Sequence, residues 1–189
     1  MRKPYWDYYR TIEDDLIGAS RYVEFCRENF QCYSVEFARI LMAAGSELDM
    51  LFKQLCKRMN PGSRADNINL YCSEVTAKFP QIAAARRYIR PFDLVLQPFE
   101  AWTPGNPPVW WTNGFNKIKH ERDRYFHFAT LENTLMAASA LMIVLFHFYS
   151  LDDGPIGRIG ISEWPKLIVP FGPDGPEEEP GAYTIPYLT

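Results

Sequence analysis

Residues 135–149 constrain the fold most, because thirteen of these fifteen residues are apolar. Only Ser139 and His147 interrupt the stretch. A helix that is apolar on all sides has to be surrounded by other elements or by lipid, and a membrane span needs roughly 20 apolar residues. The stretch is shorter than that. We therefore expect a buried central helix that begins near Thr130, no membrane association, and a core role for His147.

A second long helix is predicted by the clearest amphipathic pattern in the chain. Ser34 can cap its first turn. Residues 60–62, Asn-Pro-Gly, should end it, because proline and glycine do not readily extend a helix. Each buried large apolar side chain contributes roughly 1.5–3 kcal/mol, so this helix should be central to the core. Its apolar positions are Phe37, Leu41, Ala44, Leu48, Leu51 or Phe52, Leu55 and Met59.

Shorter patterns complete an all-α prediction: a compact bundle of four to five helices with an irregular insertion at residues 90–108. Thr11 and Asp14 have the spacing of a capping box, which indicates a first helix that starts nearby. That helix would bury Ile12, Leu16, Ala19, Val23 and Cys26. We further expect helices at residues 67–79, 80–88 and 109–128, an extended arm at 93–98 and a loop at 103–108.

The composition changes after residue 150, which divides the chain into a helical domain (residues 1–150) and an extended, acidic C-terminal tail (residues 151–189). The tail holds seven prolines and six glycines. It also holds seven acids against two basic residues, so that of the total charge of −3 the first 150 residues carry about +2. We expect residues 172–181 to be mobile, and the tail to offer a site for a protein partner. Its apolar residues should lie against the domain: Trp164, Leu167, Ile168, Val169 and Phe171.

The cysteines and the N-terminus favour a cytoplasmic protein. The four cysteines, at positions 26, 32, 56 and 72, form no Cys-x-x-Cys pair and have no metal-binding spacing. Free thiols of this kind are typical of a reducing compartment. The first residues are basic but polar residues follow them directly, so this segment does not have the pattern of a signal peptide.

The candidate chemistry lies between residues 110 and 133. On a regular helix of 100° per residue, one face would carry the apolar side chains of Trp111, Phe115, Ile118, Tyr125 and Phe126. Histidine exchanges protons near neutral pH, and neighbouring cations hold phosphate, which is what metal-independent RNA cleavage requires. The opposite face would present Asn113, Asn116, His120, Arg124 and His127, with Lys119 beside them.

Other interpretations of the same residues stay open. A polar face opposite an apolar one is typical of any surface helix. Arg122 falls on the apolar side, where it either extends out to solvent or pairs with a buried acid, for which Glu47 is the candidate. A metal site of His120, Asp123 and His127 is disfavoured, because the spacing matches no common zinc motif. We expect neither a metal nor another cofactor.

Three features of the sequence indicate a resemblance to a known family. These are the run Asn116-Lys-Ile-Lys-His120-Glu-Arg122, the sequence Ala-Thr-Leu-Glu-Asn at residues 129–133, and an apolar last helix. In these features the chain resembles the HEPN superfamily (higher eukaryotes and prokaryotes nucleotide-binding). The resemblance covers about residues 5–150. It implies a helical bundle that forms homodimers, in which paired motif helices create one cleft. Many members are metal-independent ribonucleases of toxin or defence systems.

The superfamily motif is an arginine, then a polar residue, then a histidine about five positions after the arginine. Asn116 matches the polar residue and His120 the histidine, but Phe115 occupies the arginine position. A second register, Arg122-Asp123 with His127, satisfies the complete spacing. We favour the first register, because the surrounding residues carry the resemblance.

The resemblance implies an RNA- or nucleotide-associated protein, with a metal-independent endoribonuclease as its active form. His120 would carry the proton, Asn116 would position it, and Lys119 or Arg122 would stabilise the phosphate. A competing hypothesis is a catalytically silent interaction module, in which these four residues form a structural hydrogen-bond network. A third is a small-molecule regulator with an aromatic pocket around Trp102, Trp110 and Trp111.

Overall fold

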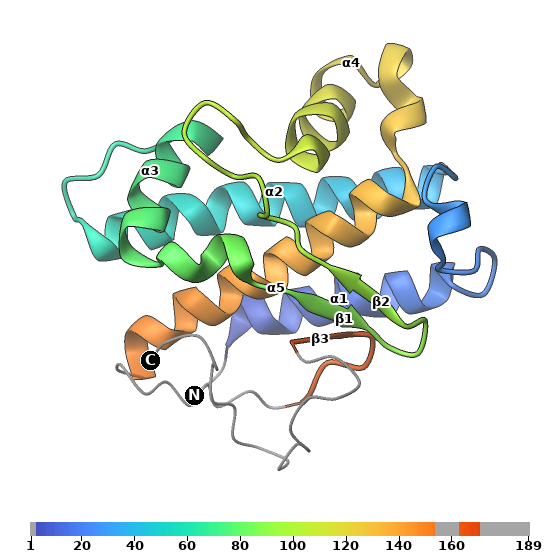
Figure 1. Cartoon of the computed structure of the whole chain (residues 1–189), viewed down its shortest axis with the longest axis horizontal. Helices are drawn as coiled ribbons and strands as arrows, with labels where there is room; N and C mark the ends of the chain where they lie inside the picture. Colours follow the sequence, from blue (N-terminus) through green and yellow to red (C-terminus); the bar gives the residue numbers. More distant parts are fainter. Residues whose placement is uncertain (1–2, 154–162, 171–189) are drawn as a thin grey trace.

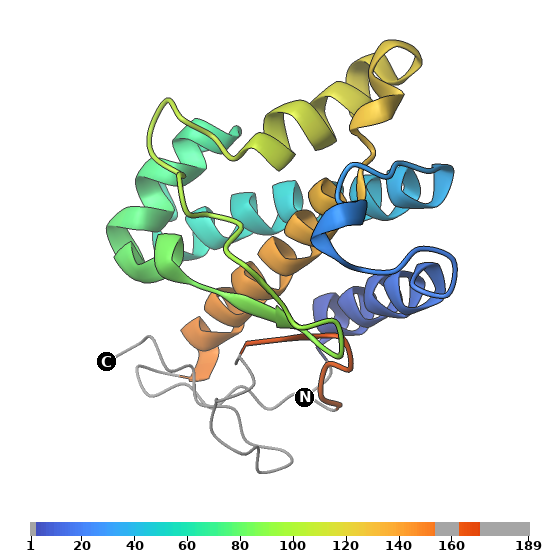
Figure 2. The same cartoon turned by 45° about the vertical axis from the view of Figure 1, so that its right-hand side comes forward.

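The computed structural model describes residues 3–153 and 163–170 and consists mostly of helices (Figure 1), which confirms the predicted all-α class. Three long helices contact one another and enclose the core: α1 (Pro4–Ala19), α2 (Val35–Met59) and α5 (Leu131–Asp153). Figure 2 shows α5 crossing between α2 and α1. The shorter helices α3 (Ile68–Lys78) and α4 (Lys117–Tyr125) pack on α2.

Helix α5 is the predicted central helix, although the length argument for it was wrong. It extends beyond the apolar stretch at both ends, and Leu131–Asp152 is long and apolar enough to cross a membrane, with a mean hydropathy of 1.8. However, 89% of the most apolar window is buried inside the domain. Burial by protein on all sides, and not insufficient length, is therefore what marks α5 as a core helix. Thr130 caps it by accepting a hydrogen bond from the Asn133 amide at 3.2 Å.

Helix α2 forms as its sequence pattern predicts. The Ser34 hydroxyl accepts a hydrogen bond from the Phe37 amide at 3.0 Å, and the helix ends at Met59, directly before Asn60 and Pro61. Helix α3 also agrees, with Asn67 as the residue whose side chain caps it.

Helix α1 begins seven residues before the predicted capping box. Pro4 occupies the first helical position, where its missing N–H is not needed. Thr11 lies inside the helix and donates its hydroxyl hydrogen bond back to the Tyr8 carbonyl at 2.7 Å. The helix ends at Ala19, so Val23 and Cys26 belong to the following loop.

A small hairpin forms where the predicted insertion begins. Only a 3-10 turn, Pro80–Ala84, forms where a helix over residues 80–88 was expected, and strand β1 (Arg87–Ile89) follows it. Strand β1 pairs antiparallel with β2 (Leu94–Leu96), which confirms the extended arm expected at residues 93–98.

Part of the C-terminal segment belongs to the fold. Strand β3 (Ile168–Val169) pairs antiparallel with β1 and completes a sheet of order β2-β1-β3. Leu167, Ile168 and Val169 are buried and Trp164 is half-buried, as their apolar character predicts. Two expectations fall outside the described residues: that Phe171 packs against the domain, and that residues 172–181 are mobile.

Candidate functional site: a groove at the kink of α4

The candidate segment is not the regular helix predicted for residues 109–128. It starts with a π-helix, Trp110–Asn116, continues as α4, and ends in the 3-10 turn Phe126–Phe128. Within α4, Glu121 leaves the helical region with φ −142° and ψ 48°. Figure 1 shows the result as two short helical pieces set at an angle at the top of the molecule. The predicted polar stripe, which assumed 100° per residue throughout, therefore does not form.

The π-helix is fixed in the core by aromatic packing. The Trp111 and Phe115 rings meet at 5.0 Å between centroids, and both side chains are buried. A Cβ at Gly45 would come within 2.7 Å of Phe115 Cε2, so the absent side chain of this glycine makes room for the ring. A Cβ at Gly114 would similarly meet the Asn133 side chain at 3.1 Å. The first part of the segment is thus held rigidly against α2 and α5.

The tryptophans do not form an open pocket. Trp102, Trp110 and Trp111 are at most 4% exposed, and the Trp110 Nε1–H donates to the Pro98 carbonyl at 2.8 Å. The hypothesis of a small-molecule site around these three rings is therefore wrong, because the rings are part of the packed core.

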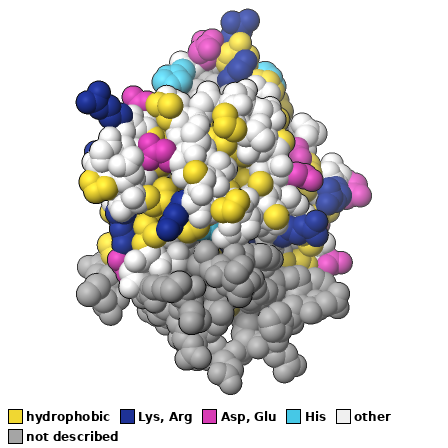
Figure 3. All heavy atoms as spheres, turned by 60° about the vertical axis from the view of Figure 1, so that its left-hand side comes forward, with side chains coloured by type: hydrophobic (Ala, Val, Ile, Leu, Met, Phe, Trp, Pro, Cys, Tyr) yellow, Lys and Arg dark blue, Asp and Glu magenta, His cyan; other side chains and the backbone are white. Residues whose placement is uncertain are grey.

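The kink opens a groove of about 710 Å³ between α4 and α2, which we call the α4 groove. Residues from before and after the kink line the groove, and Met42 of α2 contributes to the lining. His120 is exposed in this groove. Figure 3 shows basic, acidic and histidine side chains gathered at the top of the molecule, where α4 lies in Figure 1. The lining residues are Met42, Ile118, Lys119, His120, Arg122, Asp123 and Phe126.

The charged side chains of the α4 groove are not neutralised by ion pairs. Within residues 3–153 and 163–170, no ion pair includes Lys119, Arg122 or Asp123. Lys119 Nζ lies 5.3 Å from the centre of the Phe115 ring, which is a cation–π contact, and the lysine as a whole is exposed. The described lining of the groove therefore offers two cations, one carboxylate and one imidazole to a ligand.

The predicted structural network of Asn116, Lys119, His120 and Arg122 is absent from the described part of the chain, where no hydrogen bond joins these side chains. Three of the four are exposed, and a network of this kind needs mutual contact away from water. Asn113 and Asn116 are half-buried on the π-helix and do not line the groove. The structure thus brings Lys119, His120 and Arg122 together and leaves Asn116 aside.

The expected ion pair of Glu47 with Arg122 does not form either. Arg122 is exposed after the kink, so it extends to solvent, which was the alternative for this residue. Glu47 is half-buried on α2, and its burial raises the pKa of its carboxyl. Among the described residues Glu47 has no ion-pair partner.

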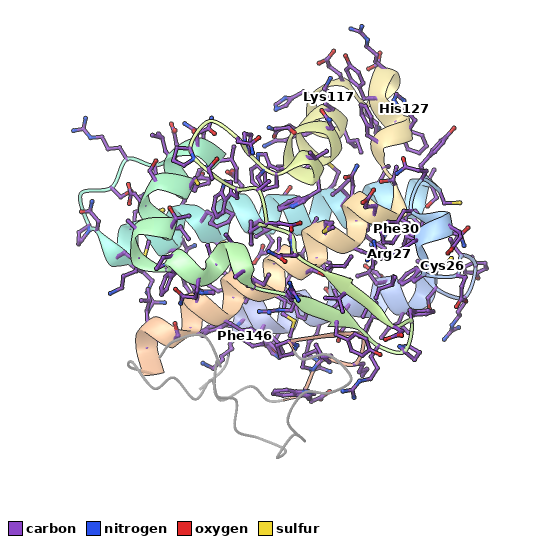
Figure 4. The ribbon with its side chains drawn as sticks, in the orientation of Figure 1. Cys26, Arg27, Phe30, Lys117, His127 and Phe146 are labelled. Carbon is purple, nitrogen blue, oxygen red and sulfur yellow. The ribbon has the colours of Figure 1, made fainter. Side chains whose placement is uncertain are left out.

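His127 and Arg124 lie outside the groove lining, in a group of aromatic and cationic side chains around the 3-10 turn. The His127 ring lies 4.3 Å from the Phe128 ring between centroids. Lys117 Nζ lies 4.0 Å over the Tyr125 ring, and Figure 4 shows Lys117 and His127 on the two pieces of the segment. Arg124 is 3.9 Å from the Glu121 carboxylate, an exposed pair of little energetic weight. Of the second motif register, Arg122 and Asp123 thus line the groove and His127 does not.

The sequence reasoning missed Asp123, Met42 and Phe126 as groove residues. The positions of Asp123 and Phe126 depend on the change of direction at Glu121, and nothing in the local sequence marks that residue as a kink, since it is neither proline nor glycine.

His147 is the core residue that its apolar surroundings predict. It is 3% exposed, its Nδ1 lies 2.8 Å from the Ile143 carbonyl, and its ring packs edge-on against Phe79. Burial lowers the pKa of His147 to about 4, so the ring is neutral in the folded protein at neutral pH. Among residues 3–153 and 163–170, no group of three or more histidine, cysteine and acidic side chains could hold a metal ion.

The fold and the groove together define a mostly α-helical domain in which an exposed histidine and two cations line one groove. Comparisons of the chain with models of protein families, with curated proteins and with solved structures find no match.

Proposed function

We propose that this chain is a cytoplasmic, HEPN-like RNA-binding protein that cleaves RNA without a metal, with His120 as the proton carrier in the α4 groove. One observation carries the proposal: His120 is exposed in an open groove whose cations, Lys119 and Arg122, have no ion-pair partner among the described residues. A free imidazole beside free cations is suited to proton transfer next to a phosphate.

The reaction that fits is an internal transfer within RNA. The ribose 2′-hydroxyl loses its proton to the neutral imidazole of His120 and its oxygen attacks the neighbouring phosphorus. The bond between phosphorus and the 5′-oxygen breaks, and that oxygen takes a proton from a second acid. The products are a 2′,3′-cyclic phosphate and a free 5′-hydroxyl. In a homodimer, as the HEPN resemblance implies, the imidazole of a second copy would supply this acid.

The cation for the phosphate has to come from Lys119 or Arg122. The arginine position of the HEPN motif holds Phe115, whose ring is buried against Gly45 and cannot be replaced by a charged group without desolvating it. Arg122 is exposed in the groove and its planar guanidinium can donate two parallel hydrogen bonds to a phosphate. In this proposal Arg122 is the main phosphate ligand.

The test is an RNA cleavage assay in EDTA with wild-type protein, His120→Ala and, as a matched control, His127→Ala. His127 is also an exposed histidine of the same segment, and it does not line the groove. We expect the wild type and His127→Ala to release fragments with cyclic phosphate ends, and His120→Ala to lose at least about 100-fold in rate, the usual contribution of a general acid or base. Equal rates for all three proteins, or no cleavage by any, would exclude the enzymatic proposal.

A catalytically silent RNA-binding or interaction module is the second candidate, and the burial of Phe115 at the motif arginine position favours it. RNA that binds and depends on Arg122, without any cleavage, would support this candidate over the enzyme. If the wild-type protein does not bind RNA, neither the enzyme nor the RNA-binding module is supported.

A further inference from the structure

Among the residues that the structure describes, Asp123 is the one carboxylate that lines the α4 groove. Its side chain is exposed, and no ion pair within the described ranges neutralises it. A negative charge in a phosphate-binding groove weakens phosphate binding, because like charges at short range repel. If the groove holds RNA, as proposed above, Asp123 has to contact a part of the nucleotide that is not phosphate.

The groove has room and a suitable wall for a base. Its volume of about 710 Å³ lies within the range of roughly 300–1,000 Å³ that is typical of small-molecule pockets. Met42, Ile118 and Phe126 supply apolar lining, against which the face of a base can pack. The Phe126 ring also makes an edge contact with Tyr33, with 6.0 Å between the ring centroids. Part of the apolar lining therefore packs against a neighbouring aromatic ring.

The kink places this wall, the carboxylate and the cations around one space. Lys119 and His120 precede Glu121, whereas Arg122, Asp123 and Phe126 follow it. A nucleotide can therefore direct its phosphate to the cations and its base to Asp123 within the same groove.

Among the four RNA bases, guanine fits a carboxylate best. Its Watson–Crick edge carries two adjacent donors, N1–H and the N2 amino group, which can meet both oxygens of one carboxylate in parallel. Uracil offers one N–H between two carbonyl groups, and the carboxylate repels the oxygens of both carbonyls. Adenine and cytosine each offer one amino group beside a ring nitrogen that accepts. We infer that Asp123 selects guanine at the nucleotide held in the α4 groove, an inference that rests on the proposed RNA binding.

The test uses single-stranded RNA decamers of uridine in which one central position is guanosine, inosine, adenosine or cytidine. Binding is measured by fluorescence anisotropy at one fixed salt concentration. We expect the guanosine decamer to bind wild-type protein at least about tenfold more tightly than the all-uridine decamer, the discrimination typical of one bidentate contact. The inosine decamer, which lacks the N2 amino group, should fall between them.

Asp123→Asn should remove the guanosine preference and should not weaken binding of the all-uridine decamer, because an amide cannot accept two parallel N–H donors. Glu121→Gln is the matched control: it neutralises the exposed acid at the kink, which does not line the groove, and should keep the preference. Thermal unfolding of each variant checks that the fold is unchanged.

The outcomes separate this inference from the proposed function. If wild type and Arg122→Ala bind all decamers equally weakly, RNA binding in the groove is refuted and the guanine inference with it. If binding depends on Arg122 but the guanosine decamer gains nothing, or if Asp123→Asn keeps the preference, the guanine inference alone is overturned.

Discussion

The ring of Phe115 occupies the space that a side chain at Gly45 would need, so the π-helix and α2 meet at a glycine. This contact fixes the start of the candidate segment and thereby the position of the α4 groove, which begins three residues later at Ile118.

Gly45→Ala should destabilise the protein by about 1–3 kcal/mol, the usual result of forcing a methyl group into a packed core. The added Cβ would come within 2.7 Å of Phe115 Cε2, so the ring has to move. Gly18→Ala in α1 is the control, because a Cβ there meets nothing within 4 Å. It should stabilise the helix by about 0.5–1 kcal/mol. Urea denaturation measures both, and equal effects would show that the Phe115 contact is not tight.

Glu13→Gln should release strand β3. The Glu13 carboxylate is 2% exposed and accepts three backbone N–H groups of residues 166–168, each at 3.0 Å. An amide nitrogen in place of one oxygen would oppose a donor with a donor. We expect a loss of about 1.5–3 kcal/mol, as for hydrogen bonds to charged groups, and faster hydrogen exchange at these three amides.

Asp14→Asn is the control for this variant, because Asp14 pairs with Lys166 on the surface, where both side chains are more than half exposed. That change should leave the free energy of unfolding almost the same. Unchanged exchange at residues 166–168 in Glu13→Gln would contradict the role of Glu13.

Acid should destabilise the fold through His147. Its pKa is about 4 in the folded protein and about 6.5 in the unfolded chain, so the unfolded chain binds more protons between these values. The stability that His147 contributes is therefore complete above about pH 6.5 and is lost as the pH falls toward 4. At pH 5 the loss should be about 2 kcal/mol. Urea midpoints of wild type and His147→Leu at pH 7.5 and 5 measure it, and an equal drop in both would assign the acid sensitivity to other groups.

RNA affinity should depend on salt through Lys119 and Arg122. Each phosphate contact to single-stranded RNA adds about 0.7 to the magnitude of the slope of log K against log salt concentration. Arg122→Ala and Lys119→Ala should each lower that magnitude by about 0.7, because both cations line the groove without an ion-pair partner among the described residues. Arg124→Ala, outside the groove lining, should leave the slope unchanged. Identical slopes for all variants would place the phosphate elsewhere.

The sequence pattern predicts the helices whose ends are marked by local chemistry. Helix α2 has a cap at Ser34 and ends before Asn60 and Pro61, and α3 has a cap at Asn67. The bounds of both helices can therefore be predicted from the local sequence. The start of α1 was predicted wrongly, because the spacing of a capping box can also occur inside a helix. The helix in fact begins at Pro4.

The site could be predicted only in part. His120, Lys119 and Arg122 were identified from residue type, but their grouping was deduced from a regular helix that the chain does not adopt. The π-helix and the kink at Glu121 depend on contacts across the fold, such as Phe115 with Gly45 and Gly114 with Asn133. Such contacts join distant parts of the chain, and a local period cannot reveal them.

The buried carboxylate of Glu13 also affects how the chain can fold during synthesis. Its hydrogen-bond donors follow it by more than 150 residues, so they leave the ribosome long after α1 does. Until then, closing α1 into the core would bury an ion without partners, at considerable cost. We therefore expect a chain that stops at the end of α5 to hold α1 less firmly than the full chain does.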